Sequence, residues 1–270
     1  MHNWNPKDYE KSSSAQYNWA LALLSKLDLK GDERILDIGC GDGKITSGIA
    51  SLVPNGSVLG IDISQEMIDF ARGKYTDDNY RNLAFQIGDA SSLNFSDEFD
   101  LTVSFACLHW IKDQLSVLQG VERSLRPGGR ILFQCGGKGN ASEILNIGTG
   151  QVKREKWSKY FGNFEFPYYF YGPEEYNIWL AQAGLKALRV ELLPKDMVHT
   201  KAGLEGWIRT TWLPYLERLP ENMRAVFIGE VADGYIERNP LDLDGMVHVQ
   251  MMRLEVEAEK LDNGLLGDPS

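Results

Sequence analysis

The stretch that decides the fold is Leu36-Asp37-Ile38-Gly39-Cys40-Gly41-Asp42-Gly43. It joins a short apolar run, residues 34–38, to a helical pattern over residues 44–52. A buried strand thus ends in an acid, and a Gly-x-Gly-x-Gly turn opens a helix. Glycine is needed where a ligand approaches the backbone closely or where φ is positive. Because ligands of open α/β sheets bind outside the carboxyl ends of the strands, the stretch predicts a binding site there.

Outward from this turn, short apolar runs alternate with helical patterns, which is typical of a parallel α/β sheet. The predicted strands are residues 34–38, 57–62, 83–87, 101–105, 130–134, 185–193 and 246–258. The predicted helices are residues 13–27, 44–52, 65–71 (with Ser64 as N-cap), 115–125 and 174–183, followed by a mostly helical stretch over 204–237. Residues 136–171 are rich in aromatics and show no clean period.

We read residues 1–270 as a single domain whose helical insertions form a cover on one side. Residues 1–30 would be an N-terminal helix or lid, and residues 31–135 the cofactor-binding core. The cover would comprise residues 136–172 and 195–245, and residues 261–270 would be a frayed tail.

Composition excludes several classes of protein. The chain has 270 residues and is 43% hydrophobic and 24% charged, and these ordinary fractions rule out a disordered or coiled-coil chain. Its formal net charge is −10. Since phosphate affinity comes mostly from Lys and Arg, no nucleic-acid partner is expected, although a local basic groove stays open. The longest nearly uncharged apolar run, residues 101–111, is too short to span a bilayer, so no membrane partner is expected.

The cysteines and histidines point to a cytoplasmic protein without a structural metal. Cys40, Cys107 and Cys135 are scattered without CxxC spacing, which suits a reducing cytoplasm better than a disulfide framework. The four histidines show neither an HExxH pair nor zinc-finger spacing, so no metal is expected.

Three acids at consecutive strand ends indicate what the site binds. Asp62 ends the second strand 19 residues after Gly43 and can accept from both hydroxyls of a ribose, and Asp89 follows the third strand, where it can accept from an adenine amino group. A dinucleotide fingerprint would place its third glycine at position 44, which is Lys44. Asp37 would repel a pyrophosphate and favour the ammonium and sulfonium of S-adenosylmethionine (SAM). A tight turn without a ligand and an NAD-dependent oxidoreductase are the less favoured alternatives.

The motifs resemble those of class I SAM-dependent methyltransferases. The residues that carry this resemblance are 37–43, 60–64 with Met67, 88–90 and 125–129. More narrowly, the chain resembles the trans-aconitate methyltransferase group and the related juvenile hormone acid methyltransferases. That likeness rests on Trp4-Asn5-Pro6, on residues 107–111, and on the late segments 207–216, 219–221 and Phe227.

The resemblance implies a Rossmann-like seven-stranded sheet whose last strand is antiparallel, in a hairpin with the sixth, under a helical, aromatic-rich substrate cover. It also implies roles for the residues of the turn and the strand ends. Gly39 and Gly41 would pack against the methionine portion of SAM, with Cys40 between them and Asp37 directing the turn. Asp62 would hold the ribose. The residues that would border the adenine or the methyl group are Ile63, Met67, Asp89, Ala90 and Phe105.

The methyl acceptor is less constrained. A carboxylate nucleophile is ionised at neutral pH and needs no general base, whereas an amine or phenol usually needs one. His109 is the one candidate base or substrate contact, unless it is a packed histidine capping the next helix. Arg209, between Trp207 and Trp212, is a candidate carboxylate clamp, unless it is a solvated surface arginine.

Aromatic residues are the remaining candidates for the acceptor site. Trp110, Tyr169 and Trp212 would wall the pocket, although aromatic clusters also pack as core. Trp4 and Gln16 would belong to an N-terminal lid over the cofactor, unless they pack on the sheet. The sequence thus predicts a cytoplasmic SAM-dependent methyltransferase acting on a small molecule, with a carboxylate as the favoured acceptor. The alternatives are an N-, O- or S-methyltransferase of another acceptor and a non-catalytic SAM-binding protein.

Overall fold

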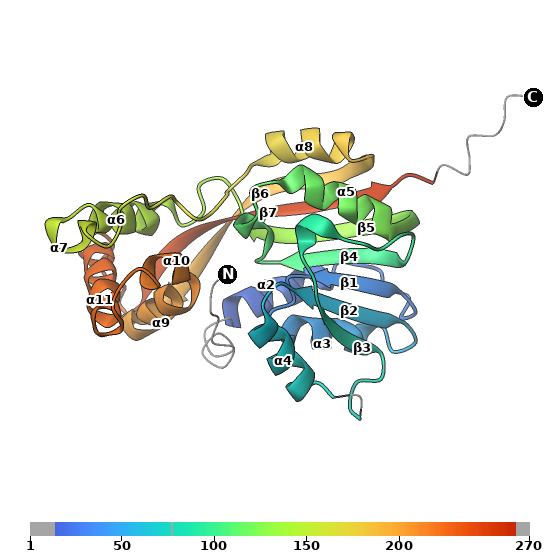
Figure 1. Cartoon of the computed structure of the whole chain (residues 1–270), viewed down its shortest axis with the longest axis horizontal. Coiled ribbons are helices and arrows are strands. Elements are labelled where there is room, and N and C mark those ends of the chain that lie inside the picture. Colours follow the sequence, from blue (N-terminus) through green and yellow to red (C-terminus); the bar gives the residue numbers. More distant parts are fainter. Residues whose placement is uncertain (1–13, 77, 263–270) are drawn as a thin grey trace, which may run out of the picture.

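A seven-stranded mixed sheet forms the centre of the protein (Figure 1). The computed structural model describes residues 14–76 and 78–262. The strands are β1 (Arg34–Ile38), β2 (Ser57–Asp62), β3 (Leu83–Ile87), β4 (Phe99–Phe105), β5 (Leu125–Gly136), β6 (Leu185–His199) and β7 (Val247–Lys260), in the order β3-β2-β1-β4-β5-β7-β6. β1 to β5 are parallel, and β7 runs antiparallel to both β5 and β6. The predicted seven-stranded sheet is confirmed, with helices rather than a tight turn joining β6 to β7.

Helices cover both faces of the sheet. On one face α2 (Ser14–Leu24), α3 (Lys44–Leu52) and α4 (Gln65–Lys74) bury apolar side chains in one cluster with β1 and β4. On the other face α5 (Gln114–Ser124) and α8 (Pro173–Gln182) pack in a second cluster with β5 and β7. Two short 3₁₀ turns, η1 (Ala90–Ser92) and η2 (Leu108–Trp110), follow β3 and β4.

The predicted start of α4 shows how local sequence fixes these elements. Ser64 has an extended backbone, and its side chain accepts a hydrogen bond from the Met67 amide at 3.3 Å. It therefore satisfies one of the amides that a helix leaves without an intrahelical partner. β1, α3, β2 and β3 also begin and end at the predicted residues.

β6 continues beyond its predicted end at residue 193, although the next residue is Pro194 and a proline cannot donate a backbone hydrogen bond. In the structure β6 is the last strand of the sheet, and its pairing with β7 extends to His199 opposite Val247. A proline is tolerated on such an edge strand, since its missing N–H need not serve a second neighbour.

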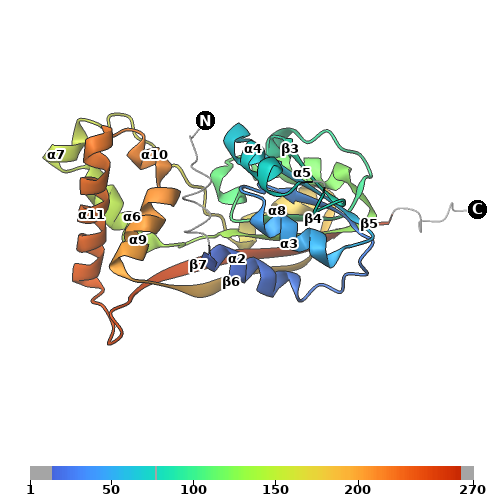
Figure 2. The ribbon, with the colours of Figure 1, turned by 90° about the horizontal axis from the view of Figure 1, so that it is seen from below.

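A helical cover lies beyond one end of the sheet, where β6 and β7 run on into it (Figure 2). It consists of α6 (Ser142–Val152), α7 (Glu155–Ser158), α9 (Lys201–Thr211), α10 (Leu213–Leu216) and α11 (Glu221–Arg238). The cover has a third apolar cluster, in which large aromatics such as Trp157, Trp212 and Tyr215 are fully buried. α6 and α7 were not predicted, because residues 136–171 show no clean helical period, and Gly148 and Gly150 within α6 are poor helix formers. Gly148 is needed for packing, since a Cβ there would come within 2.4 Å of the Trp212 ring.

Within residues 14–76 and 78–262, no helix has the length and apolar character needed to cross a membrane. The same residues include no group of three or more His, Cys, Asp or Glu side chains placed to hold a metal ion.

Candidate active site

A cavity of about 530 Å³ lies at the carboxyl ends of the parallel strands. We call it the first cavity. Its size is within the usual range for sites that bind small molecules and cofactors. The residues that line it are Ile38, Gly39, Gly41, Ile61, Asp62, Ile63, Ser64, Met67, Gly88, Asp89, Ala90, Phe105, Ala106, Cys107, Trp110, Ile111, Pro167 and Tyr169.

The glycine turn forms the floor of the first cavity and is tied to β2. The amide of Gly39 donates to the Ile61 carbonyl at 2.8 Å, and the amide of Gly41 donates to Oδ2 of Asp62 at 3.0 Å. Gly39 has φ of 74°, and a Cβ there would lie 2.3 Å from Sγ of Cys107. This position thus requires glycine because of a neighbouring protein side chain, in addition to any ligand.

Asp62 presents its carboxylate to the first cavity while backbone amides hold it in place. Oδ2 accepts from Gly41, and Oδ1 accepts from the Ser64 amide at 2.9 Å. Burial raises the pKa of Asp62, and these backbone donors oppose that shift. A carboxylate has about four acceptor positions, so two remain for a pair of ligand hydroxyls.

Asp37 lies beneath the turn rather than in the wall of the first cavity. Its side chain is 2% exposed, and Oδ2 accepts a hydrogen bond from Oγ1 of Thr46 at 2.8 Å. Burial raises the pKa of Asp37 to about 7; the Thr46 hydrogen bond opposes this shift, and the charge of Asp62 adds to it. This carboxylate therefore braces the start of α3 and acts on a ligand only through its charge.

The other residues predicted to bind the cofactor fall into two groups. Five of them line the first cavity, namely Ile63, Met67, Asp89, Ala90 and Phe105. Cys40 does not line the first cavity, because it is buried against Gly60. A Cβ added to Gly60 would lie 2.9 Å from Cβ of Cys40. The carboxyl group of Asp62 beside apolar Ile63 and Met67 suits a nucleoside, whose ribose is polar and whose adenine is flat and apolar. The first cavity therefore fits SAM.

A second, smaller cavity of about 70 Å³ adjoins the first, with which it shares Ala106 and Trp110. Most of its wall is aromatic or aliphatic. The residues that line it are Ala106, His109, Trp110, Asn140, Ala141, Leu145, Tyr168, Phe170, Trp207, Thr211, Trp212, Met251 and Arg253. This second cavity lies where the end of β4 meets the cover and β7.

His109 lines the second cavity as a neutral imidazole. Its ring centroid is 5.8 Å from those of both Trp110 and Phe170. Burial, together with the positive charge of Arg253, lowers the pKa of His109 to about 3. The Gly136 amide donates to Nδ1 over 3.4 Å, which places the proton of the neutral ring on Nε2.

The structure separates the residues predicted to bind the acceptor. Trp110 and Tyr169 line the first cavity, and Trp212 lines the second. Arg209 lies on an exposed face of α9 and lines neither cavity. Trp4 lies outside the described residues, and Gln16 lies in α2, with its side chain outside what the structure describes.

Sequence reasoning missed Arg253, which lies on β7 and lines the second cavity. Its side chain is 3% exposed, and Cζ lies 5.5 Å from the centre of the Trp19 ring. A signal was present in the sequence, because Arg253 continues the two-residue spacing of buried Val247, Val249 and Met251. An arginine at an inward-facing strand position is rare enough to mark a site.

Comparisons with known proteins agree with this geometry. Residues 29–163 match a family described as a methyltransferase domain. Protein 235L of Invertebrate iridescent virus 6, which is named as a methyltransferase, is 30% identical over 86% of this chain and 85% of its own. Trans-aconitate 2-methyltransferase of Methylobacterium nodulans is 27% identical over 96% of this chain and 99% of its own.

Solved structures share the fold. Phosphoethanolamine N-methyltransferase 2 of Haemonchus contortus, solved with S-adenosylhomocysteine, aligns with a TM-score of 0.61 at 20% identity, over 95% of this chain and 57% of that one. The YcgJ protein of Bacillus subtilis aligns with a TM-score of 0.62 at 18% identity, over 91% and 100% of the two chains. Taken with the family match and the first cavity, the chain belongs to the methyltransferase domain family and is a SAM-dependent methyltransferase.

Proposed function

We propose that this enzyme methylates a carboxylate oxygen of a small organic acid. The observation that carries this proposal is the state of His109, whose pKa is lowered to about 3. A histidine with that pKa does not take up a proton from the acceptor at neutral pH. This favours an acceptor that already has a free electron pair at neutral pH, as a carboxylate has.

The other titratable groups in the cavity walls do not replace His109 as a base. Asp62 is held by two backbone amides, and Oδ1 of Asp89 accepts from the Ser91 amide at 2.8 Å. Burial raises the pKa values of Cys107 and Tyr168, so both stay protonated at neutral pH. We therefore assign no general base among the described residues that line the two cavities.

The named substrates of relatives support an acid as acceptor. The Methylobacterium nodulans relative is a trans-aconitate 2-methyltransferase. Another relative, 31% identical over 52% of this chain, is the malonyl-[acyl-carrier protein] O-methyltransferase of Acetivibrio thermocellus. Both names describe methylation of an acid, and we extend that acceptor class to this chain.

In this proposal the chain binds, orients and shields the reactants. Asp62 would accept hydrogen bonds from the ribose hydroxyls, and Ile63 and Met67 would flank the adenine. When bound, SAM supplies an activated methyl group: a C–O bond to the carboxylate forms as the S–C bond breaks, its electron pair stays on sulfur, and a methyl ester and neutral S-adenosylhomocysteine result. Trp110 and Tyr169 would exclude water from the first cavity, and alignment of the reactants would supply much of the rate.

The cover indicates where the acceptor binds, and the cysteines indicate the compartment in which the enzyme works. We infer that the cover is the acceptor side of a single domain, because its residues Trp207, Thr211 and Trp212 complete the second cavity. The cavity is small, which favours a small-molecule acceptor. The three cysteines are free thiols, which is consistent with a reducing cytoplasm as the place of work.

The proposal is tested by product chemistry. The purified protein is first titrated with SAM by calorimetry, and binding in the micromolar range is expected. It is then incubated with SAM and a panel of carboxylic acids, amines, phenols and thiols, with S-adenosylhomocysteine as the readout of turnover. Turnover with acids, giving methyl esters that alkali hydrolyses, is expected. Turnover confined to amines, phenols or thiols would refute a carboxylate acceptor.

A further inference from the structure

The second cavity has a chemical character that the methyl-donor site does not explain. It shares the wall residues Ala106 and Trp110 with the first cavity, so it lies beside the methyl-donor site. Asp62 and Asp89 line the first cavity, and Asp37 lies beneath it. A carboxylate acceptor is repelled by these acids unless a positive charge lies close by.

Arg253 supplies that positive charge. It is the arginine in the wall of the second cavity and is 3% exposed, and its Cζ lies 5.5 Å from the centre of the Trp19 ring. A guanidinium carries five N–H donors along its edge. A guanidinium also matches a carboxylate in shape, because two parallel N–H groups can bind its two oxygens.

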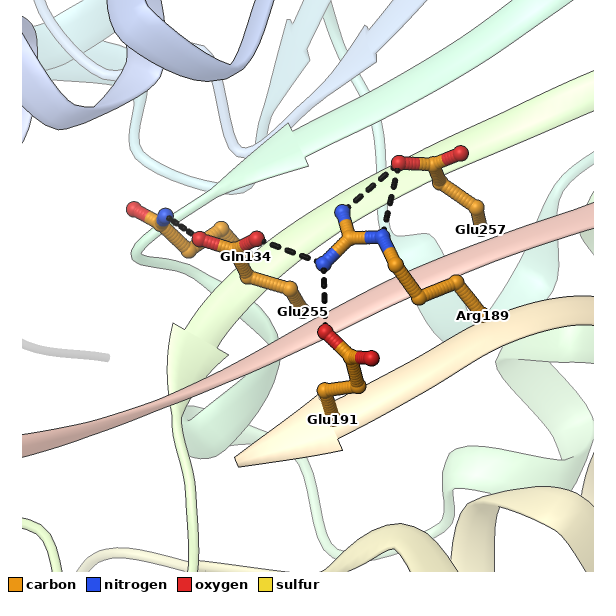
Figure 3. A network of polar contacts seen from close by, with 5 residues as sticks. All are labelled: Gln134, Arg189, Glu191, Glu255 and Glu257. Atoms are coloured by element: carbon orange, nitrogen blue, oxygen red, sulfur yellow. Dashed lines mark hydrogen bonds and ion pairs between the residues drawn. The ribbon is translucent and has the colours of Figure 1, made fainter. Parts of the chain in front are cut away.

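A polar network cross-links β5, β6 and β7 (Figure 3). Arg189 of β6 binds Glu255 at 2.8 Å and Glu257 at 2.6 Å, both on β7, and Gln134 of β5 donates to Glu255 at 2.8 Å. Glu255 and Glu257 lie two and four residues after Arg253, on the same face of the strand. Because the network joins three neighbouring strands, it fixes β7 where Arg253 leaves it.

His109 completes an anion-binding pair. Its Nδ1 accepts from the Gly136 amide, so Nε2 carries the proton and acts as a donor. Arg253 lies close enough for its charge to lower the pKa of His109, which keeps that ring neutral. A fixed cation and a neutral N–H donor in one largely apolar cavity can both bind a carboxylate. Neither of them can accept a hydrogen bond from an ammonium group.

We propose that the second cavity binds the carboxylate of the methyl acceptor, with Arg253 as its counter-ion and His109 as a further donor. This inference rests on the proposed function and names the residues that recognise the acid. Most of the remaining wall, including Leu145, Trp207 and Met251, is apolar, so the acceptor is a small acid whose carbon frame next to the carboxylate is largely apolar.

Binding of probe acids to the complex with S-adenosylhomocysteine tests this site without turnover. Calorimetry would compare benzoate and trans-aconitate with the neutral isostere benzamide on the wild type, Arg253→Met, Arg253→Lys and the matched control Arg238→Met, which alters an exposed arginine on α11. We expect the wild type to prefer an acid over benzamide by more than tenfold. Arg253→Met should lose that preference, and Arg238→Met should keep it.

The variants and the binding of SAM separate the possible failures. Arg253→Lys keeps the charge and loses the two-pronged geometry, so its acid binding should be at least threefold weaker than that of the wild type. This variant tests the site in case Arg253→Met does not fold. Equal acid binding by wild type and Arg253→Lys, or a wild type without preference for acids, would overturn the acceptor site. If the wild type did not bind SAM, or if its turnover were confined to amines, the proposed function would be overturned instead.

Discussion

The backbone amide of Gly41 donates a hydrogen bond of 3.0 Å to Oδ2 of Asp62, which joins the turn after β1 to the acid at the end of β2. The same carboxylate accepts from the Ser64 amide through Oδ1. Two motifs that are 21 residues apart in the sequence thus form one cofactor platform, in which Asp62 fixes the turn and faces the ligand.

Replacing Asp62 should therefore weaken SAM binding more than the loss of one ligand contact would. Asp62→Ala removes the ribose acceptor and the group that orients Gly41. Hydrogen bonds to a charged group contribute about 1.5–3 kcal/mol each, so we expect at least a tenfold, and up to a thousandfold, rise in the Kd for SAM by calorimetry. Asp69→Asn, on the exposed side of α4, is the matched control and should bind as the wild type does. An unchanged Kd in Asp62→Ala would remove Asp62 from the site.

Asp37 makes the stability of the ligand-free protein depend on pH. Its folded-state pKa is about 7, above its ordinary value of 3.8, chiefly because it is buried. Between these values the folded state holds a proton that the unfolded state has lost, so stability falls as pH rises through this window and levels off above pH 7. Asp37→Asn keeps an acceptor for Thr46 but does not titrate.

We therefore expect the Tm of Asp37→Asn, relative to wild type, to increase between pH 5 and pH 7 and then stay level. Thermal unfolding of both proteins, each without ligand, from pH 5 to pH 8 measures this difference. A difference that is constant across the range would show that Asp37 is ionised throughout.

His109 should act as a donor and not as a base. Because its pKa is about 3, the ring stays neutral across pH 5–8 and adds no inflection to the pH profile of kcat/KM. His109→Gln keeps an N–H donor, so its profile should have the wild-type shape, with activity within a few-fold. His109→Ala should lose more than tenfold. A rising limb near pH 6.5 in the wild type that disappears in His109→Gln would identify His109 as a general base.

The sequence predicts the first half of the fold well because its signals there are local. The Ser64 cap, the glycine turn and the short apolar strands each act within a few residues, and the acids at the strand ends meet because parallel strands share one edge. Asp37 shows the limit of that reasoning: its position in the motif is local, but its burial beneath the turn depends on how α3 packs.

The acceptor side depends on long-range packing, and there the sequence is less informative. The neighbours Trp207 and Trp212 favour Arg209 as a clamp, yet a helix turns by about 100° per residue, and Arg209 faces outward. Arg253 comes to the second cavity only because β7 pairs between β5 and β6 and reaches the cover. No local pattern determines that neighbourhood.

The close approach of Gly39 to Cys107 gives a stability prediction that separates two effects. In Gly39→Ala the new Cβ would lie 2.3 Å from Sγ and 2.4 Å from Cβ of Cys107, and φ of 74° is unfavourable for alanine by about 1–2 kcal/mol. Both terms destabilise the fold, so urea unfolding should show a loss well above that backbone cost alone. Cys107→Gly removes both clashing atoms, and the double variant Gly39→Ala/Cys107→Gly should recover the steric part.

The backbone part should remain, so we expect the double variant to be less stable than Cys107→Gly by about 1–2 kcal/mol, the cost of a left-handed alanine. A double-mutant cycle of urea unfolding curves measures the coupling between the two positions. If the two substitutions were simply additive, the glycine would be required by its φ alone, and the contact between the turn and the end of β4 would not constrain residue 39.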